Sequence, residues 1–200
     1  VAVNHLEAHA LTARLPGLIE GGADFPYLLL LISGGHCQCI AVRGVGQHAR
    51  LGGTLDDAAG EAFDKVAKLV GLGYPGGPAI DRLAPTGDPE AFPLSPPRMS
   101  DGSLDFSFSG FKTAVWQHVR DNPPAPEAIP DICASVQEAL VDMLVDTTQE
   151  ALDETGVDRL IVSGGVSANR RLRERMTEMG SLRGVDVVVA TPGRALDHIR

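Results

Sequence analysis

Two short Ser-Gly-Gly segments constrain the fold of this 200-residue chain more than any other feature. The first, residues 33–35, closes an apolar run at 27–32, and the second, residues 163–165, closes a predicted strand at 159–162 whose last three residues are apolar. A continuous apolar run is typical of a strand that is buried on both faces. Glycine lacks the Cβ that would keep a ligand from the backbone, and backbone N–H groups at such turns bind phosphate. Each segment alone is explained by a tight turn, but the pair predicts two related units around one nucleotide-like ligand.

Hydrophobic spacing divides the remainder of the chain into helices and strands. Periodicity predicts helices at 5–15, 56–70, 111–120, 131–155 and 168–179, and strands at 27–32, 37–43, 159–162 and 185–190. The first two strands are expected to form a hairpin. Asp56 and Asp57 are expected in the first turn of their helix, where the helix dipole favours anions, and Asp131 is expected to cap the longest helix. Glycines and a proline predict a loop at 71–77. Strands mixed with helices indicate an α/β fold.

Composition limits the function classes. Seventeen basic and 26 acidic side chains give a net charge of −9, which argues against a free-standing nucleic-acid binder held by charge. The longest apolar run holds about eight residues, whereas a membrane span needs about 20, so no membrane partner is expected. Three cysteines cannot form a closed set of disulfides, so we expect a reducing, cytoplasmic location.

His5 and His9 are the first candidate metal ligands. Their i, i+4 spacing on a helix places both imidazoles within reach of one cation. Glu7 points away from the shared face, and it does not directly follow the first histidine as the general base of a metalloprotease does. Two ordinary surface or core histidines are the alternative interpretation.

Three further groups of residues each have two interpretations, and a pair of cysteines has one. The acidic group Asp56, Asp57, Glu61 and Asp64 is either a solvated helix face or a set of acceptors for a ligand hydroxyl. The stiff, open segment 74–81 is a structural turn or a place where a ligand approaches the backbone. The arginines at 170–175 and 183 are an exposed helix face or a phosphate-binding surface. Cys37 and Cys39 lack a matching pair of ligands and are interpreted as small apolar residues.

Six motifs occur in one order and are far more specific together than singly. They are residues 4–9 (Asn-His-Leu-Glu-Ala-His), 32–36 (Ile-Ser-Gly-Gly-His), 56–65 (Asp-Asp-Ala-Ala-Gly-Glu-Ala-Phe-Asp-Lys), 74–78 (Tyr-Pro-Gly-Gly-Pro), 105–110 (Asp-Phe-Ser-Phe-Ser-Gly) and 164–169 (Gly-Gly-Val-Ser-Ala-Asn). From residue 1 to about residue 192, the chain closely resembles the tRNA threonylcarbamoyladenosine transferase family, formerly described as a glycoprotease family. The resemblance implies an actin-like ATPase fold, which is ribonuclease H-like, and a two-lobed protein of which this chain is the carboxyl-terminal part.

The resemblance implies a metal-assisted transfer. The threonylcarbamoyl group passes from threonylcarbamoyl-AMP to the N6 amine of the adenosine next to the tRNA anticodon. One divalent metal, Fe²⁺ rather than Zn²⁺, is held by His5, His9 and Asp197. The flanks of Asp197 depart from the family's last motif, so its assignment rests on ungapped counting from Asn169. The implied partners are tRNA, which binds through the arginines at 170–183 or through other subunits, a metal-free actin-like paralogue and a P-loop ATPase.

The resemblance also implies the ligand residues and the organisation of the chain. The adenylate, or another adenine nucleotide, is expected on Leu31, Ile32, Ser33, Gly34, Gly35, Asp64, Gly77, Asp81 and Asn169, in a cleft that the metal also faces. Residues 1–26 are expected to be a remnant of the amino-terminal lobe, 27–190 the main lobe and 191–200 a divergent, truncated tail. As a fragment, the chain is expected to be weakly active or inactive alone. A zinc metallopeptidase and a non-catalytic, nucleotide-binding assembly partner are the alternatives.

Overall fold

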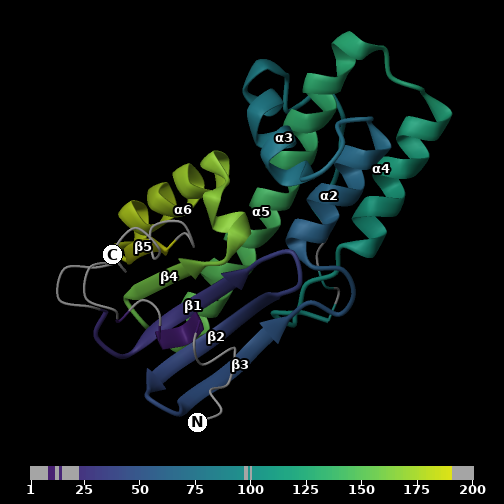
Figure 1. The fold of residues 1–200 in the computed structure, drawn as a ribbon. Coiled ribbons are helices and arrows are strands. Elements are labelled where there is room, and N and C mark those ends of the chain that lie inside the picture. Colours follow the sequence, from purple (N-terminus) through teal and green to yellow (C-terminus); the bar gives the residue numbers. More distant parts are fainter. Residues whose placement is uncertain (1–8, 12–13, 15–22, 97–98, 100, 191–200) are drawn as a thin grey trace, which may run out of the picture.

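A mixed five-stranded sheet organises the molecule (Figure 1). The computed structural model describes residues 9–11, 14, 23–96, 99 and 101–190. The strand order is β3-β2-β1-β4-β5. β1 and β2 pair antiparallel, as do β2 and β3, while β4 runs parallel to β1 and to β5. The strands span β1 (Tyr27–Ile32), β2 (Cys37–Gly44), β3 (Gln47–Gly53), β4 (Arg159–Ser163) and β5 (Asp186–Ala190).

The central strand β1 was predicted correctly because it is buried on both faces and is therefore apolar throughout. All six of its residues are buried, since β1 has a strand on either side and packed layers on both faces. The predicted hairpin of β1 and β2 is confirmed, as are β4 and β5. β3 was not predicted. Its first four residues are exposed at the sheet edge, so it lacks the apolar alternation that marks a half-buried strand.

Five helices of eight or more residues accompany the sheet in the described part of the chain. Figure 1 shows α2, α3 and α4 grouped beyond one end of the strands, next to the far end of the long α5, while α6 lies beside β4 and β5. Three short 3₁₀ turns join these elements: η1 (Ala84–Thr86), η2 (Pro126–Ala128) and η3 (Gly165–Ala168). The helices span α2 (Ala59–Leu69), α3 (Gly76–Leu83), α4 (Ser109–Asp121), α5 (Ile129–Thr155) and α6 (Arg170–Arg183).

The structure corrects three predictions about the residues at the starts of α2, α3 and α5. α2 begins at Ala59, so Asp56 and Asp57 precede it and do not occupy its first turn. The predicted loop at 71–77 ends at Pro75, because α3 begins at Gly76. Its Pro78 is tolerated there, since a first-turn N–H has no partner within the helix. α5 begins at Ile129, which places Asp131 inside the first turn, where it accepts a hydrogen bond from the backbone N–H of Asp88 at 2.8 Å.

The hydrophobic core lies on both faces of the sheet. The larger cluster joins one face of β1, β2 and β4 to the apolar sides of α2, α4, α5 and α6. A smaller cluster on the other face includes Tyr27, Leu29 and Ala10. The Tyr27 hydroxyl donates to the Ala10 carbonyl at 2.5 Å, which ties the segment that carries His9 to the start of β1. No helix in the described ranges is long and apolar enough to cross a membrane.

Candidate functional site

The two Ser-Gly-Gly turns lie next to each other. β1 and β4 are parallel neighbours, and Leu31 pairs with Ser163 in their register, so both strands end at the same edge of the sheet. Gly164 has a φ of 107°, and a Cβ added there would meet the Ile32 carbonyl oxygen at 2.1 Å. Only glycine allows this approach of the second turn to the end of β1. The predicted pairing of two related turns is therefore a feature of the fold.

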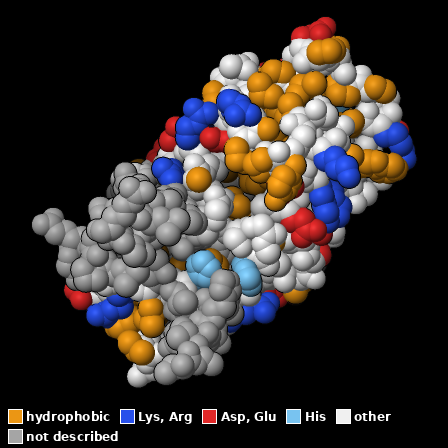
Figure 2. Space-filling view, in the orientation of Figure 1, with side chains coloured by type: hydrophobic (Ala, Val, Ile, Leu, Met, Phe, Trp, Pro, Cys, Tyr) orange, Lys and Arg blue, Asp and Glu red, His pale blue; other side chains and the backbone are white. Residues whose placement is uncertain are grey.

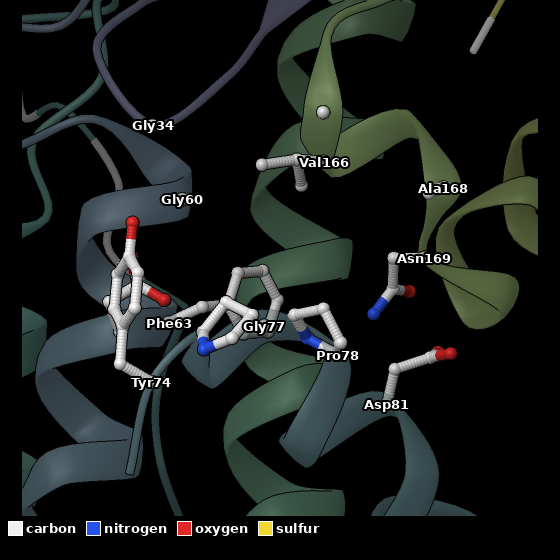
Figure 3. Close-up of a pocket in the computed structure, with 13 residues that line it drawn as sticks. Gly34, Gly60, Phe63, Tyr74, Gly77, Pro78, Asp81, Val166, Ala168 and Asn169 are labelled. Atoms are coloured by element: carbon white, nitrogen blue, oxygen red, sulfur yellow. The ribbon is translucent and has the colours of Figure 1, made fainter. Parts of the chain in front are cut away.

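A cavity of about 380 Å³ opens beside these turns (Figure 3). Both turns contribute to it, and so do α2, the start of α3 and the residue that precedes α6. A pocket of about 300–1,000 Å³ is the usual size for a small-molecule ligand. The cavity is lined by Gly34, Gly60, Phe63, Asp64, Tyr74, Pro75, Gly77, Pro78, Asp81, Gly165, Val166, Ala168 and Asn169.

Glycines leave parts of the cavity wall without side chains. A Cβ added at Gly34 or Gly165 would meet no atom within 4 Å, and one added at Gly77 would meet only the Phe63 Cβ at 3.9 Å. A side chain at these positions would therefore extend into the cavity and not into the protein. The bare backbone gives a ligand close access to peptide N–H and C=O groups.

Asp64 fixes the junction between α2 and α3. Its Oδ1 accepts a hydrogen bond from the Gly76 N–H at 2.7 Å, and a Cβ on Gly76 would lie 2.7 Å from the Asp64 Cα. The side chain lines the cavity, and its second carboxylate oxygen adds acceptor capacity there.

Asp81 and Asn169 line the cavity with polar groups that also hold its wall together (Figure 3). The two oxygens of Asp81 accept from the backbone N–H and from the Nε of Arg170, each at 3.0 Å. The Oδ1 of Asn169 accepts from the Leu172 N–H at 2.9 Å, which caps α6, and its Nδ2 donates to Gln137 at 2.7 Å. Both side chains link α6 to neighbouring helices.

The other four predicted ligand residues belong to β1 and its turn. Leu31 and Ile32 are fully buried in the strand. The Ser33 Oγ accepts hydrogen bonds from the N–H groups of Gly35 and His36, at 3.3 and 3.0 Å. These residues shape the turn that brings Gly34 to the cavity.

The predicted metal ligands are placed only in part. His9 is half-buried in a helical stretch at 9–11, and it is not among the residues that line the cavity. His5 and Asp197 lie outside the described residues. Within the described ranges, no three His, Cys, Asp or Glu side chains gather as a metal site. The expectation that metal and adenylate share one cleft therefore stays a prediction.

Gly60 is a cavity residue that the sequence reasoning did not single out. Its N–H donates to the Ser33 carbonyl at 3.1 Å, and a Cβ at this position would lie 2.9 Å from the Gly34 Cα. The start of α2 is thereby held against the first turn. A glycine in the first turn of a helix, where it lowers helix propensity, is the signal that could have identified it.

The acidic group does not form a solvated helix face. Asp57 bridges α2 and α4 by accepting from Lys65 at 2.7 Å and from Lys112 at 2.8 Å. Hydrogen bonds from Lys112 and Lys65 lower the pKa of Asp57. Asp56 accepts from Ser107, Ser109 and the Phe108 N–H; burial alone would raise its pKa, but these hydrogen bonds outweigh burial and lower it. Glu61 pairs with Lys65 at 2.8 Å, one turn along α2.

The arginines of α6 do not form an open basic surface. Most of them pair with carboxylates on α3 and α5, which leaves less free positive charge for a phosphate than the sequence alone suggests. Arg170 pairs with Asp81, Arg171 and Arg175 pair with Glu138, Arg183 pairs with Asp153, and Arg173 donates to the Ser167 carbonyl. Cys37 and Cys39 are buried, as expected of small apolar residues.

The sheet and the site define a class of protein. An antiparallel meander of three strands, continued by two parallel strands, has the ribonuclease H-like topology of the actin-like ATPase fold. Two glycine turns meet at the ends of the central strands beside a ligand-sized cavity. The solved structures that this chain resembles agree with this class. One of them is full-length HypF in its phosphate- and nucleotide-bound form, which matches with a TM-score of 0.73 and 15% identity. The match covers 98% of this chain and 41% of the HypF chain.

A second solved structure, component A of (R)-2-hydroxyglutaryl-CoA dehydratase from Acidaminococcus fermentans, matches with a TM-score of 0.53 and 17% identity. That match covers 96% of this chain and 63% of the other. At these identities both structures establish the fold alone.

The sequence comparisons identify the family. The model of the tRNA N6-adenosine threonylcarbamoyltransferase family matches residues 1–193, and the chain belongs to this family. It is 53% identical to the tRNA N6-adenosine threonylcarbamoyltransferase of Rhodospirillum rubrum over 98% of its own length and 55% of the relative's. It is 48% identical to the enzyme of the same name from Geobacter sp., over 99% of its length and 57% of the relative's. The chain thus spans somewhat more than half the length of these curated relatives.

Proposed function

We propose that this chain forms the adenylate-binding part of an enzyme that transfers a threonylcarbamoyl group to the N6 amine of adenosine in tRNA. The observation that carries the proposal is the cavity between the two glycine turns, in a chain that belongs to the tRNA N6-adenosine threonylcarbamoyltransferase family. Gly34, Asp64, Gly77, Asp81 and Asn169, which the family resemblance implies as ligand residues, all line this one cavity.

Each part of the wall suits one part of an adenylate. The bare backbone at Gly34 and Gly165 can approach the phosphate, because no Cβ stands between the ligand and the peptide groups. Asp64 offers an acceptor to a ribose hydroxyl through the carboxylate oxygen that Gly76 does not use. Asp81 and Asn169 position this wall, because they join α3, α5 and α6 through Arg170 and Gln137.

The reaction requires a well-placed acyl carbon and a good leaving group. The N6 amine of the adenosine attacks the carbonyl carbon of the threonylcarbamoyl group, AMP leaves with the electrons of the broken C–O bond, and the amine loses one proton. A cavity that holds the AMP portion fixes the carbonyl for this attack and favours departure of the phosphate. Positioning of this kind is a large part of enzymatic rate enhancement.

A divalent metal would assist the transfer. We propose His5, His9 and Asp197 as its ligands, since two imidazoles and one carboxylate suit Fe²⁺ or Zn²⁺ and leave coordination positions open. When bound, the metal would polarise the threonylcarbamoyl oxygens. We further propose tRNA, a metal-free actin-like paralogue and a P-loop ATPase as partners, in the cytoplasm.

A transfer assay tests the function. The chain is joined to the amino-terminal segment of the Rhodospirillum rubrum relative, and incorporation of labelled threonine into tRNA is measured with bicarbonate, ATP and the enzyme that makes the adenylate. We expect incorporation by the joined protein, at least about tenfold less incorporation by its His9→Ala variant, and full metal content only in the unsubstituted joined protein. Equal incorporation by both proteins would refute the role of His9. Cleavage of casein without incorporation would favour the metallopeptidase, and nucleotide binding without either activity would favour the assembly partner.

A further inference from the structure

A second hollow, which we call the lysine groove, lies between α2 and α4. Its volume is about 620 Å³, and it is lined by Lys65, Lys68, Leu69, Lys112, Thr113 and Trp116. The chain contains three lysines and one tryptophan, and all four line this groove. Figure 2 shows Lys and Arg side chains beside hydrophobic ones on the side of the molecule where α2 and α4 lie.

The lysine groove is suited to an anion. No carboxylate is among its lining residues, although the chain carries a net charge of −9. Lys68 is exposed, and no carboxylate in the described part of the chain pairs with it. Lys65 is held by Asp57 and Glu61, and Lys112 by Asp57, so these two ammonium groups are fixed in place. An ammonium has three donors, which leaves capacity on both for a phosphate oxygen.

Trp116 supplies a stacking surface at the edge of the groove. The side chain is 43% exposed, which is unusual for the largest aromatic residue. The Arg120 guanidinium lies 4.6 Å from the ring centroid and restricts the ring while adding a positive charge nearby. Lysines that contact phosphates, next to an exposed aromatic ring, are the combination that binds single-stranded nucleic acid.

The groove and the adenylate cavity share α2. Asp64 lines the cavity and Lys68 lines the groove, and these residues are four apart on the helix. They therefore lie on similar faces, about 6 Å apart along the helix axis. A molecule bound in the groove lies one helical turn from the cavity.

We propose that the lysine groove docks an unpaired stretch of RNA, with a base stacked on Trp116 and phosphates on Lys68, Lys65 and Lys112. The proposal rests on the proposed function, since it names the surface by which the RNA substrate reaches the adenylate cavity. Unpaired RNA is favoured over duplex because the aromatic ring can stack only on a base that has left its helix. The groove differs from the arginines of α6 in having an exposed aromatic ring beside its charges and an exposed lysine, Lys68, for which no carboxylate partner is seen in the described part of the chain.

The fluorescence of Trp116 reports on this site directly, because it is the only tryptophan in the chain. The 200-residue chain is titrated with a short RNA stem–loop and, separately, with the same stem as an uninterrupted duplex. We expect saturable quenching by the stem–loop that weakens as salt rises, and at least about fivefold weaker binding of the duplex. Absence of quenching at low salt would overturn the proposal, and so would equal quenching by an acidic polyglutamate peptide, which would identify an acidic protein as the occupant.

Variants separate stacking from charge, with affinity measured by anisotropy of labelled RNA. Trp116→Ala should weaken binding by about fivefold or more, and Trp116→Phe should restore most of it. Lys68→Gln should lower the slope of log affinity against log salt by about 0.7, the value for one phosphate contact on a single strand. Arg43→Gln on β2 is the matched control, because it removes one exposed positive charge outside the groove. Equal effects of Arg43→Gln and Lys68→Gln would overturn the proposal.

The transfer assay distinguishes failure of this proposal from failure of the proposed function. If the joined protein modifies tRNA and Trp116→Ala leaves the KM for tRNA unchanged, the groove proposal fails and the function stands. If the chain binds RNA in the groove but the joined protein transfers nothing, the groove stands and the proposed function fails.

Discussion

Asp57 joins two helices by pairing with a lysine on each. Its carboxylate accepts from Lys65 on α2 and from Lys112 on α4, so one side chain joins the two helices that border the lysine groove. The side chain is 15% exposed; if it became neutral, Lys65 would keep Glu61 as a partner, but the ion pair that joins Lys112 to α2 would be lost. Asp57 therefore acts as a structural anchor, and not as the helix-dipole acid that its position in the sequence suggested.

Protonation of Asp57 at acidic pH should lower the stability of the fold. The pKa of Asp57 in the folded chain is lower than in the unfolded chain, where it is about 3.9. A lowered pKa contributes stability above the unfolded value, and that stability is lost as the pH falls through the folded value. We expect the free energy of unfolding, measured with urea, to decrease from about pH 5 downward. Asp57→Asn should be less stable at pH 7 and should show a smaller decrease with acid, and an unchanged acid dependence in this variant would contradict the assignment.

At the scale of elements, α3 shows how closely two helices must approach to form the cavity. A Cβ on Gly76 would lie 2.5 Å from the Ala67 Cβ, whereas Gly77 has open space around it apart from the Phe63 Cβ at 3.9 Å. The two consecutive glycines at the start of α3 thus have different structural roles. The first permits helix packing and the second leaves room in the cavity.

The two glycines should differ in their tolerance of alanine. Gly76→Ala should lower the free energy of unfolding by about 1–3 kcal/mol, because the added methyl overlaps α2. Gly77→Ala should change it by less than about 1 kcal/mol, since alanine favours the helix and meets no close neighbour. Urea unfolding of both variants measures the difference. Equal stability of the two would show that α2 and α3 are not packed as closely as described.

Asn169 performs two tasks at the start of α6. It caps the helix through the Leu172 N–H and satisfies the buried Gln137 through its amide. Asn169→Ala should cost about 2 kcal/mol or more, from loss of the cap and from the unpaired amide of Gln137. Asn169→Asp should lose much less, because its carboxylate accepts from Leu172 and from a reoriented Gln137 amide. Thermal unfolding of both variants tests this, and equally large losses would refute the capping role.

The sequence predicts an element well when its burial is uniform or its ends are marked. β1 is predicted because it is an unbroken apolar run, and β4 because three apolar residues form its centre. The end of α5 is marked by Gly156, which caps the helix at a φ of 65°. β3 is missed because its exposed edge residues carry no apolar pattern. The start of α3 is missed because glycine and proline usually break helices, and here Asp64 holds the first turn from outside.

At the scale of the whole molecule, the sheet determines the site. Parallel pairing of β1 with β4 brings together two turns that are 130 residues apart in the sequence, and α2, α3 and α6 complete the cavity around them. Similar motifs suggested that the turns cooperate, but their adjacency depends on strand order, which no local pattern contains. The internal partners of Asp81 and Asn169 likewise depend on how α6 packs. The family resemblance therefore implied that these residues bind the ligand, but it did not reveal that they also hold the cavity wall together.

The proposed site requires that the open wall at Gly165 faces a bound adenylate. Isothermal titration of AMP into the chain, into Gly165→Ala and into Gly110→Ala measures it directly. A Cβ at either glycine meets no atom within 4 Å, but only Gly165 lines the cavity, so Gly110→Ala on α4 is the matched control. We predict that the chain and Gly110→Ala bind AMP equally and that Gly165→Ala binds at least about tenfold more weakly while unfolding at the same temperature. Equal affinity in all three would contradict the account.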